Sequence, residues 1–223
     1  MTLAEMRQAL LTAAVLASMS CLSYAQGTFQ NLNFEEAVVP DVPSGQGGDP
    51  VSVANGVPEW AVYLGGIQQS SMFHNDVSLG AAEVAIFGPH WNPSQILEGN
   101  YSVSLQHSTA GPPTMPAIGQ TGQIPEAVES LTFYADRSVP GAYIVTFAGQ
   151  PIPVVPIEST PGYIVFGGDI SRFAGQAGEL LFQGDGELDN ISFSDQPIPE
   201  PSVLGLSALG ALLLGRRVMR RRR

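Results

Sequence analysis

Apolar and polar side chains alternate in short runs through the middle of the chain, from residue 29 to residue 193. A period of two is typical of β-strands that bury one face. Gly, Pro or Asp bounds each run, and these residues end strands. The clearest runs are residues 101–105, 130–135, 143–147, 163–166, 180–182 and 188–193. We therefore predict an all-β domain of roughly eight to ten short strands, folded as a single β-sandwich of the jelly-roll type.

The pattern changes at the N-terminal end, where residues 9–17 form an apolar run preceded by Arg7. Ala25 is the second of two small residues at the spacing that a signal peptidase recognises. We predict that residues 1–25 are a secretory signal peptide, which the secretion translocon recognises and which is cleaved after Ala25. A lipoprotein signal that uses Cys21 is the alternative, although the residues before this cysteine fit it poorly.

A second apolar run, residues 203–215, lies near the C-terminal end. At ~1.5 Å rise per residue its 13 residues make a helix of ~20 Å, shorter than the ~30 Å hydrocarbon core. Such a helix spans a membrane when flanking arginines snorkel and the bilayer thins locally. The run is followed by Arg216, Arg217, Arg220, Arg221, Arg222 and Arg223. These arginines stay cytoplasmic under the positive-inside rule, so we predict a short transmembrane helix with the body outside the inner membrane.

Between these ends, residues 26–195 are predicted to form one domain, because the length leaves room for a single core. Residues 196–223 are the tail.

This body is strongly acidic. Residues 26–200 carry 19 carboxylates and two arginines, and the chain has no lysine. Such a surface repels phosphate backbones, which argues against nucleic acid as a partner. Divalent cations, which need oxygen ligands, suit it better.

The order of the C-terminal parts is specific. Pro199, Glu200 and Pro201 come first, then the apolar run, then the arginines, at the extreme end of the chain. This tail resembles the PEP-CTERM sorting signal of Gram-negative bacteria, in which the Pro-Glu-Pro triplet is the recognition element. The resemblance implies an exosortase as partner, transient anchoring in the inner membrane, and release to the cell surface or the exopolysaccharide. A permanent membrane anchor whose tail is never cut is the alternative.

Several short motifs are spread over the body. They are residues 31–35, Trp60, and residues 99–105, 119–121, 130–135 and 188–193. Together they resemble the galactose-binding-like jelly roll of bacterial carbohydrate-binding modules. The resemblance implies that the first and last strands lie side by side and that Glu35 and Asp189 help to hold a structural calcium ion. The alternatives are that Glu35 is a surface carboxylate beside Glu36 and that Asp189 is a turn residue at a strand end.

An enzyme would need a recognisable catalytic constellation, and the sequence offers little. Its three histidines are widely spaced, and no nucleophile elbow, zinc-protease motif or phosphate loop is present. Two carboxylates at glycosidase spacing remain conceivable in so acidic a body, but Glu126 and Glu129 look like charged residues at a strand edge. We therefore predict a non-catalytic protein, with a secreted glycan hydrolase or lyase as the alternative.

A sugar-binding body needs an exposed aromatic side chain that can stack on a sugar ring. Trp91 is the candidate glycan contact, because it lies in a loop rich in Pro and Gly beside His90 and Asn92. Trp60, within a strand pattern, is expected to fill the core. The favoured interpretation is an exported surface or exopolysaccharide-matrix protein whose body has weak affinity for glycans.

Overall fold

The computed structural model describes residues 28–40, 50–110, 112–137 and 143–198. Several predicted features lie outside these ranges, so the structure does not bear on them. They are the signal peptide with its cleavage site at Ala25, the triplet Pro199, Glu200 and Pro201, the apolar helix 203–215, and the flanking arginines Arg216, Arg217, Arg220, Arg221, Arg222 and Arg223. None of the helices in the described ranges has the length and the apolar character needed to cross a membrane.

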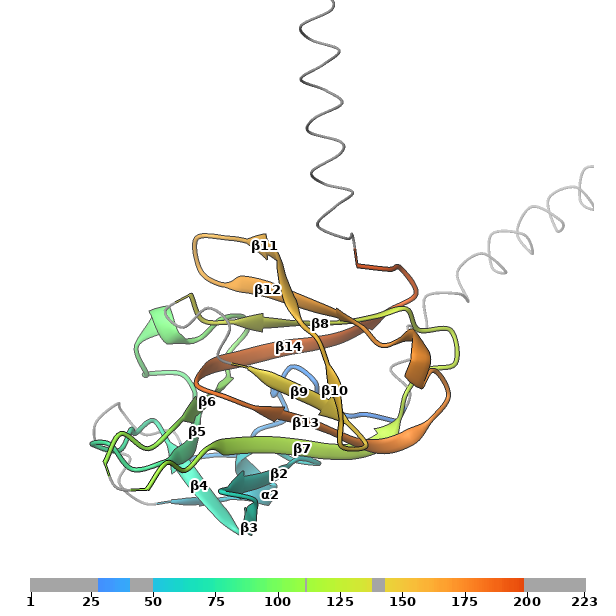
Figure 1. Ribbon diagram of the computed structural model, residues 1–223. Helices are drawn as coiled ribbons and strands as arrows, with labels where there is room; N and C mark the ends of the chain where they lie inside the picture. The colour runs from blue at the N-terminus through green and yellow to red at the C-terminus, as the bar shows by residue number, and fades with distance from the viewer. Residues whose placement is uncertain (1–27, 41–49, 111, 138–142, 199–223) are drawn as a thin grey trace, which may run out of the picture.

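The described chain folds into two stacked β-sheets (Figure 1). The eight-stranded sheet has the order β1 (Val51–Ser52), β4 (Ser71–His74), β5 (Glu83–Phe87), β6 (Ser102–Gln106), β14 (Gly186–Ser194), β8 (Ser130–Ala135), β12 (Ile164–Asp169) and β11 (Val155–Ser159). The six-stranded sheet has the order β10 (Gln150–Ile152), β9 (Ile144–Phe147), β13 (Ala177–Gln183), β7 (Pro116–Gln123), β2 (Ala61–Leu64) and β3 (Ile67–Gln69). All strand pairs are antiparallel except β4–β5.

Within the described residues, three short helical segments connect the strands. They are α2 (Val53–Gly56) and the 3-10 turns η1 (Pro93–Gln95) and η2 (Ser171–Phe173). The two-sheet β-sandwich predicted from the alternating pattern is therefore confirmed. The described residues contain 14 strands, more than the roughly eight to ten expected.

One hydrophobic core fills the space between the sheets, and aromatic side chains dominate it. Trp60, at 4% exposure, lies against Phe34 and Phe182, and its indole nitrogen donates to the carbonyl of Asn31 at 3.0 Å. The prediction that Trp60 fills the core is thus confirmed. Phe133, fully buried, contacts Phe182 edge-on from the opposite sheet, which is a favoured aromatic geometry.

All six of the clearest alternating runs are strands: they became β6, β8, β9, β12, β13 and β14. The long strand β7 gave a weaker signal because it contains Gly119 and Gly122 in place of large apolar residues. Packing explains the glycines. A Cβ at Gly122 would lie 2.9 Å from the ring of Phe29, and one at Gly119 would lie 2.9 Å from Leu181.

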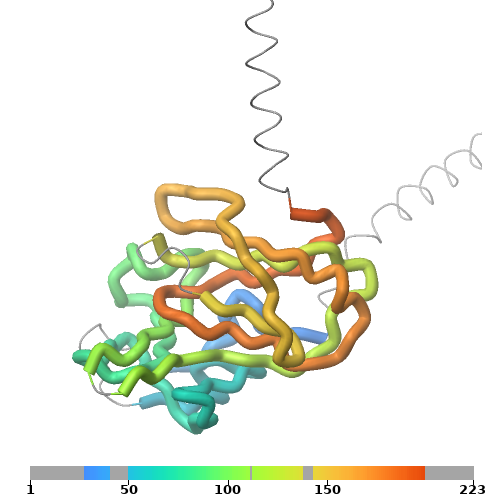
Figure 2. The backbone as a smooth tube through the Cα atoms, in the orientation of Figure 1, coloured from blue at the N-terminus to red at the C-terminus, as the bar shows by residue number. Residues whose placement is uncertain are grey.

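The N-terminal segment 28–37 is a series of turns, not the first strand that the family resemblance implies. Asn31 and Phe34 adopt positive φ angles of 47° and 57°, which extended pairing does not allow. The segment nevertheless runs along the last strand, because the amide of Ile191 in β14 donates to Leu32 at 2.9 Å. Figure 2 shows this segment in blue passing behind the strands.

Candidate functional site

Glu35 and Asp189, the two residues expected to hold a metal ion, line the same surface pocket of about 290 Å³. They come from opposite ends of the described chain: Glu35 from the N-terminal turns and Asp189 from β14. The loop before β6 forms the third wall. The full lining is Asn33, Glu35, Glu98, Gly99, Asp189 and Asn190.

Glu35 holds the loop before β6 in place. Its Oε1 accepts hydrogen bonds from the backbone amides of Asn100 at 2.7 Å and Tyr101 at 3.1 Å, and its Oε2 accepts one from Asn100 Nδ2 at 2.9 Å. Gly99 makes this approach possible, since a Cβ there would lie 2.3 Å from Glu35 Oε1 and the residue has a φ of 65°. Glu35 therefore anchors the loop before β6.

Asp189 projects from the face of β14 that points away from the core, because its neighbour Leu188 belongs to the core. It is nevertheless 1% exposed, since the loop before β6 covers it. Its Oδ2 accepts from the Ser102 hydroxyl at 2.8 Å and the Glu98 amide at 3.2 Å. Burial above all, and then the charge of Glu35, raise the pKa of Asp189 to about 7 despite these bonds.

Glu98 is a third carboxylate in the pocket, which the sequence did not single out. Its Oε2 accepts a hydrogen bond from Asn190 Nδ2 at 2.6 Å. Asn190 has a φ of 45° and lies where the pairing of β14 with β8 shifts register, between Asp189 and Ser192. Such a bulge turns a side chain out of the regular alternation, and here it directs Asn190 toward the pocket. No motif in the sequence marks this irregularity.

The pocket suits a hard cation by the type of its ligands. Three carboxylates and two side-chain amides line it, and the lining contains no basic residue. Across the described residues, however, no three His, Cys, Asp or Glu side chains gather closely enough to form a ready-made metal site. An ion bound between Glu35 and Asp189 would therefore need amide or backbone oxygens to complete its shell. The residues present fit calcium, which accepts such mixed oxygen shells.

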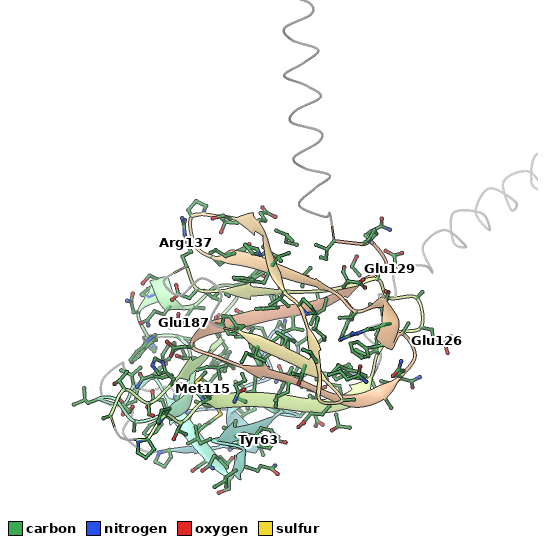
Figure 3. The ribbon with its side chains drawn as sticks, in the orientation of Figure 1. Tyr63, Met115, Glu126, Glu129, Arg137 and Glu187 are labelled. Atoms are coloured by element: carbon green, nitrogen blue, oxygen red, sulfur yellow. The ribbon has the colours of Figure 1, made fainter. Side chains whose placement is uncertain are left out.

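A second buried carboxyl, Glu187, lies on the same outward face of β14. Burial first, and then the hydrogen bond and charge of Asp136, raise the pKa of Glu187 to about 7. Gln95 covers it from η1, donating to Glu187 Oε1 at 3.1 Å. In Figure 3, Glu187 lies at the end of the sandwich opposite to Glu126 and Glu129, so those two acids belong to no shared cluster with it.

Trp91, the candidate glycan contact, packs against the outer face of the sheet. Its ring stacks on Phe87 at a centroid distance of 4.5 Å and an angle of 16°, and its indole nitrogen donates to Gln95 Oε1 at 2.9 Å. The side chain is half-buried, so a role in glycan contact stays a prediction. Neither Trp60 nor Trp91 lines the carboxylate pocket, and a hydrolase cleft was expected to combine carboxylates with tryptophan.

No family model matches this chain, and comparisons with curated proteins and with solved structures find no similar protein.

Proposed function

We propose that this chain is an exported protein of the cell surface or exopolysaccharide matrix, whose tail is processed by an exosortase. Its body would be a non-catalytic jelly roll with weak affinity for glycans. The observation that carries the proposal is the order of the tail: the triplet at residues 199–201, the apolar run 203–215 and the terminal arginines. This order is what an exosortase substrate needs: a recognition element, a temporary membrane anchor and a cytoplasmic stop.

The body supports this proposal by being self-contained up to the residue before the triplet. After β14 ends at Ser194, the carbonyl of Gln196 accepts from the Ser130 hydroxyl at 2.7 Å. Ile198 packs on β12, where a Cβ at Gly167 would lie 2.4 Å from its Cδ1. Cleavage at or after Pro199 would therefore leave every one of these contacts in place.

We further propose that the body binds a structural calcium ion in the carboxylate pocket. Glu35 and Asp189 would be its charged ligands, with Glu98, Asn33 and Asn190 near enough to line the same space. The ion would neutralise carboxylates that now face one another without a basic partner in the lining. Its role would be to join the N-terminal turns, the loop before β6 and the last strand.

A glycan hydrolase is less well supported by the same pocket. The oxygens of Glu35 and Asp189 are occupied by backbone amides and by the Ser102 hydroxyl. Such bonds hold a loop in place, whereas a catalytic acid pair must present its oxygens to the glycosidic bond. We therefore keep the non-catalytic interpretation as the proposal.

The test of sorting is the intact mass and the membrane fractionation of the protein in its own host, with and without the exosortase gene. We expect the mature chain to begin at Gln26 and to lack the segment after the triplet when the enzyme is present. We expect the uncut tail to hold the protein in the membrane when the enzyme is absent. A tail that remains in the membrane in both strains would contradict the proposal and indicate a permanent anchor.

A further inference from the structure

A second pocket, of about 200 Å³, lies beside the loop that follows β5 and shares no lining residue with the carboxylate pocket. Two of the chain's three histidines meet there. His74 ends β4, and His90 comes from the loop after β5. The full lining is Val39, Pro40, His74, Pro89, His90 and Tyr101.

His74 is a buried polar group that the fold itself does not use. Its side chain is 3% exposed, and no hydrogen bond joins its imidazole to another described residue. Among the described side chains, Glu83 Oε1 is the one polar atom that is both fully inaccessible and without a hydrogen-bond partner. The His74 nitrogens are therefore not fully inaccessible, and they can be reached through the pocket. Burial lowers the pKa of His74, which keeps its ring neutral and able both to donate and to accept a hydrogen bond.

The loop that carries His90 is held in a strained conformation. His90 has a φ of 77°, a region that a residue with a side chain seldom occupies. The fully buried Asn75 clamps the loop: its Oδ1 accepts from the Gly88 amide at 2.9 Å and its Nδ2 donates to the Pro89 carbonyl at 3.2 Å. The position of His90 on the pocket is therefore built into the fold and is not an accident of a loose loop.

The walls and charge of the pocket restrict the ligand. Val39, Pro40 and Pro89 supply apolar surface beside the Tyr101 ring, so most of the lining suits the C–H face of a small molecule. The lining contains no lysine or arginine that could bind an anionic ligand. The two arginines of the described body, Arg137 and Arg172, bond backbone carbonyls elsewhere, and 19 carboxylates surround them in residues 26–200.

We propose that this pocket binds one neutral sugar unit of a glycan, with the imidazoles of His74 and His90 bonding its hydroxyl groups. A hydroxyl group both donates and accepts, which matches the unpartnered neutral ring of His74. The pocket, of about 200 Å³, has room for a single pyranose ring. This inference rests on the proposed function of the body in a glycan matrix, and it names the sugar class and the residues.

The test uses the histidine ring signals in NMR spectra of the mature protein purified from its host. The chain has three histidines, and the third, His107, lies 2.9 Å from Asp185 and serves as an internal control. His90→Ala and His107→Ala each remove one signal and so assign all three. Glucose, galactose, mannose and N-acetylglucosamine are added one at a time with EDTA present, and galacturonic acid is the anionic probe.

We expect at least one neutral sugar to shift the His74 and His90 signals in a saturable way, with a Kd on the order of millimolar for so small a ligand. The His107 signal should not shift with any sugar, and galacturonic acid should not shift the His74 and His90 signals. His90→Ala should weaken binding at least about fivefold, whereas His107→Ala should leave it unchanged. His90 is an exposed residue, and unchanged His74 and His107 signals in the sugar-free variant would show that it still folds.

Three results would overturn the inference: no neutral sugar shifts the two signals, all three histidines shift alike, or the two signals respond to Zn²⁺ and to no sugar. The sorting experiment is independent of these outcomes. If the protein is sorted correctly but no sugar shifts its His74 and His90 signals, the sugar-binding inference alone is refuted. A protein that keeps its tail but binds a sugar through both histidines would refute the sorting alone.

Discussion

At the scale of single residues, the most unusual feature is a set of carboxyls that point away from the core and are buried all the same. Glu83, Glu187 and Asp189 are 1%, 6% and 1% exposed. Each alternates with a core residue along its strand, so each lies on the outer face of the eight-stranded sheet. The loop between β5 and β6 covers Glu187 and Asp189, because Gln95 bonds Glu187 and the Glu98 amide bonds Asp189, whereas the Ser78 amide before β5 bonds Glu83.

Glu83 gives a prediction for pH dependence. Burial raises its pKa, and its Oε1 has no hydrogen-bond partner among the described residues. The carboxyl is neutral in both states below its unfolded pKa. As pH rises through the higher folded pKa, the folded state must hold a buried charge and stability is lost. We expect Glu83→Gln to raise the free energy of unfolding at pH 8 by about 1 kcal/mol. The loss of stability with rising pH above about 5 should also be smaller in this variant.

Chemical denaturation at several pH values measures this effect. Glu129→Gln makes the same change at an exposed position and should alter neither the stability nor its pH dependence. A Glu83→Gln protein that is less stable than the parent at pH 8 would show that the charged carboxylate is stabilising.

At the scale of elements, Glu35 joins the N-terminal turns to the loop before β6. Its carboxylate accepts three hydrogen bonds from Asn100 and Tyr101. We expect Glu35→Ala to lower the free energy of unfolding by about 1–2 kcal/mol, because the two backbone amides lose their partner. Hydrogen exchange should show faster exchange at Asn100 and Tyr101. Glu36→Ala, at the neighbouring exposed residue, is the matched control, and equal effects of both changes would disprove the anchor.

The proposed calcium ion acts on the same elements and gives a separate prediction. Calcium should raise the Tm of the parent protein, because a ligand that binds the folded state alone stabilises it by mass action. Asp189→Asn removes one charged ligand while keeping the shape and the oxygen that accepts from Ser102. We expect this variant to fold and to lose the calcium response. Calorimetry with calcium and with EDTA decides the matter, and an equal response in both proteins would exclude Asp189 as a ligand.

At the scale of the whole molecule, the last described residues complete the β-sandwich. The contacts of Gln196 and Ile198 close the sandwich at its C-terminal end. A chain of residues 26–198 should therefore have the same Tm as a chain of residues 26–201, which also includes the triplet. A chain that ends at Ser194 should lose about 1–2 kcal/mol of stability, because Ser130 loses its acceptor and Gly167 its apolar cover. Equal Tm values for both truncated chains would show that these contacts contribute nothing.

Much of the sandwich could be predicted from the sequence, because its central strands alternate strictly between core and surface. β8, predicted at residues 130–135, begins and ends as expected. β7 was harder to recognise because Phe29 and Leu181 fill the space above its glycines, so the large apolar side chains come from elsewhere in the chain. The turns at residues 28–37 were also not foreseen, since the positive φ angles of Asn31 and Phe34 depend on their packing against β14 and Trp60.

The site divides in the same way. The resemblance to carbohydrate-binding modules predicts Glu35 and Asp189 as partners, and the structure places both on one pocket. Glu98 and Asn190 join them there through a loop and a bulge that leave no mark in the sequence. The meeting of His74 with His90 likewise depends on the buried clamp of Asn75.

The sequence by itself determined the sandwich class, the strongly acidic charge and the core position of Trp60, because local alternation and composition are properties of neighbouring residues. It is also the whole basis of the predicted export and sorting segments, whose evidence is a linear order of residue types. The tertiary structure alone decided which carboxyls are buried, which loop covers them and which side chains share a pocket. Those outcomes depend on contacts between residues about 90 positions apart, such as Glu98 with Asn190, and no local pattern specifies them.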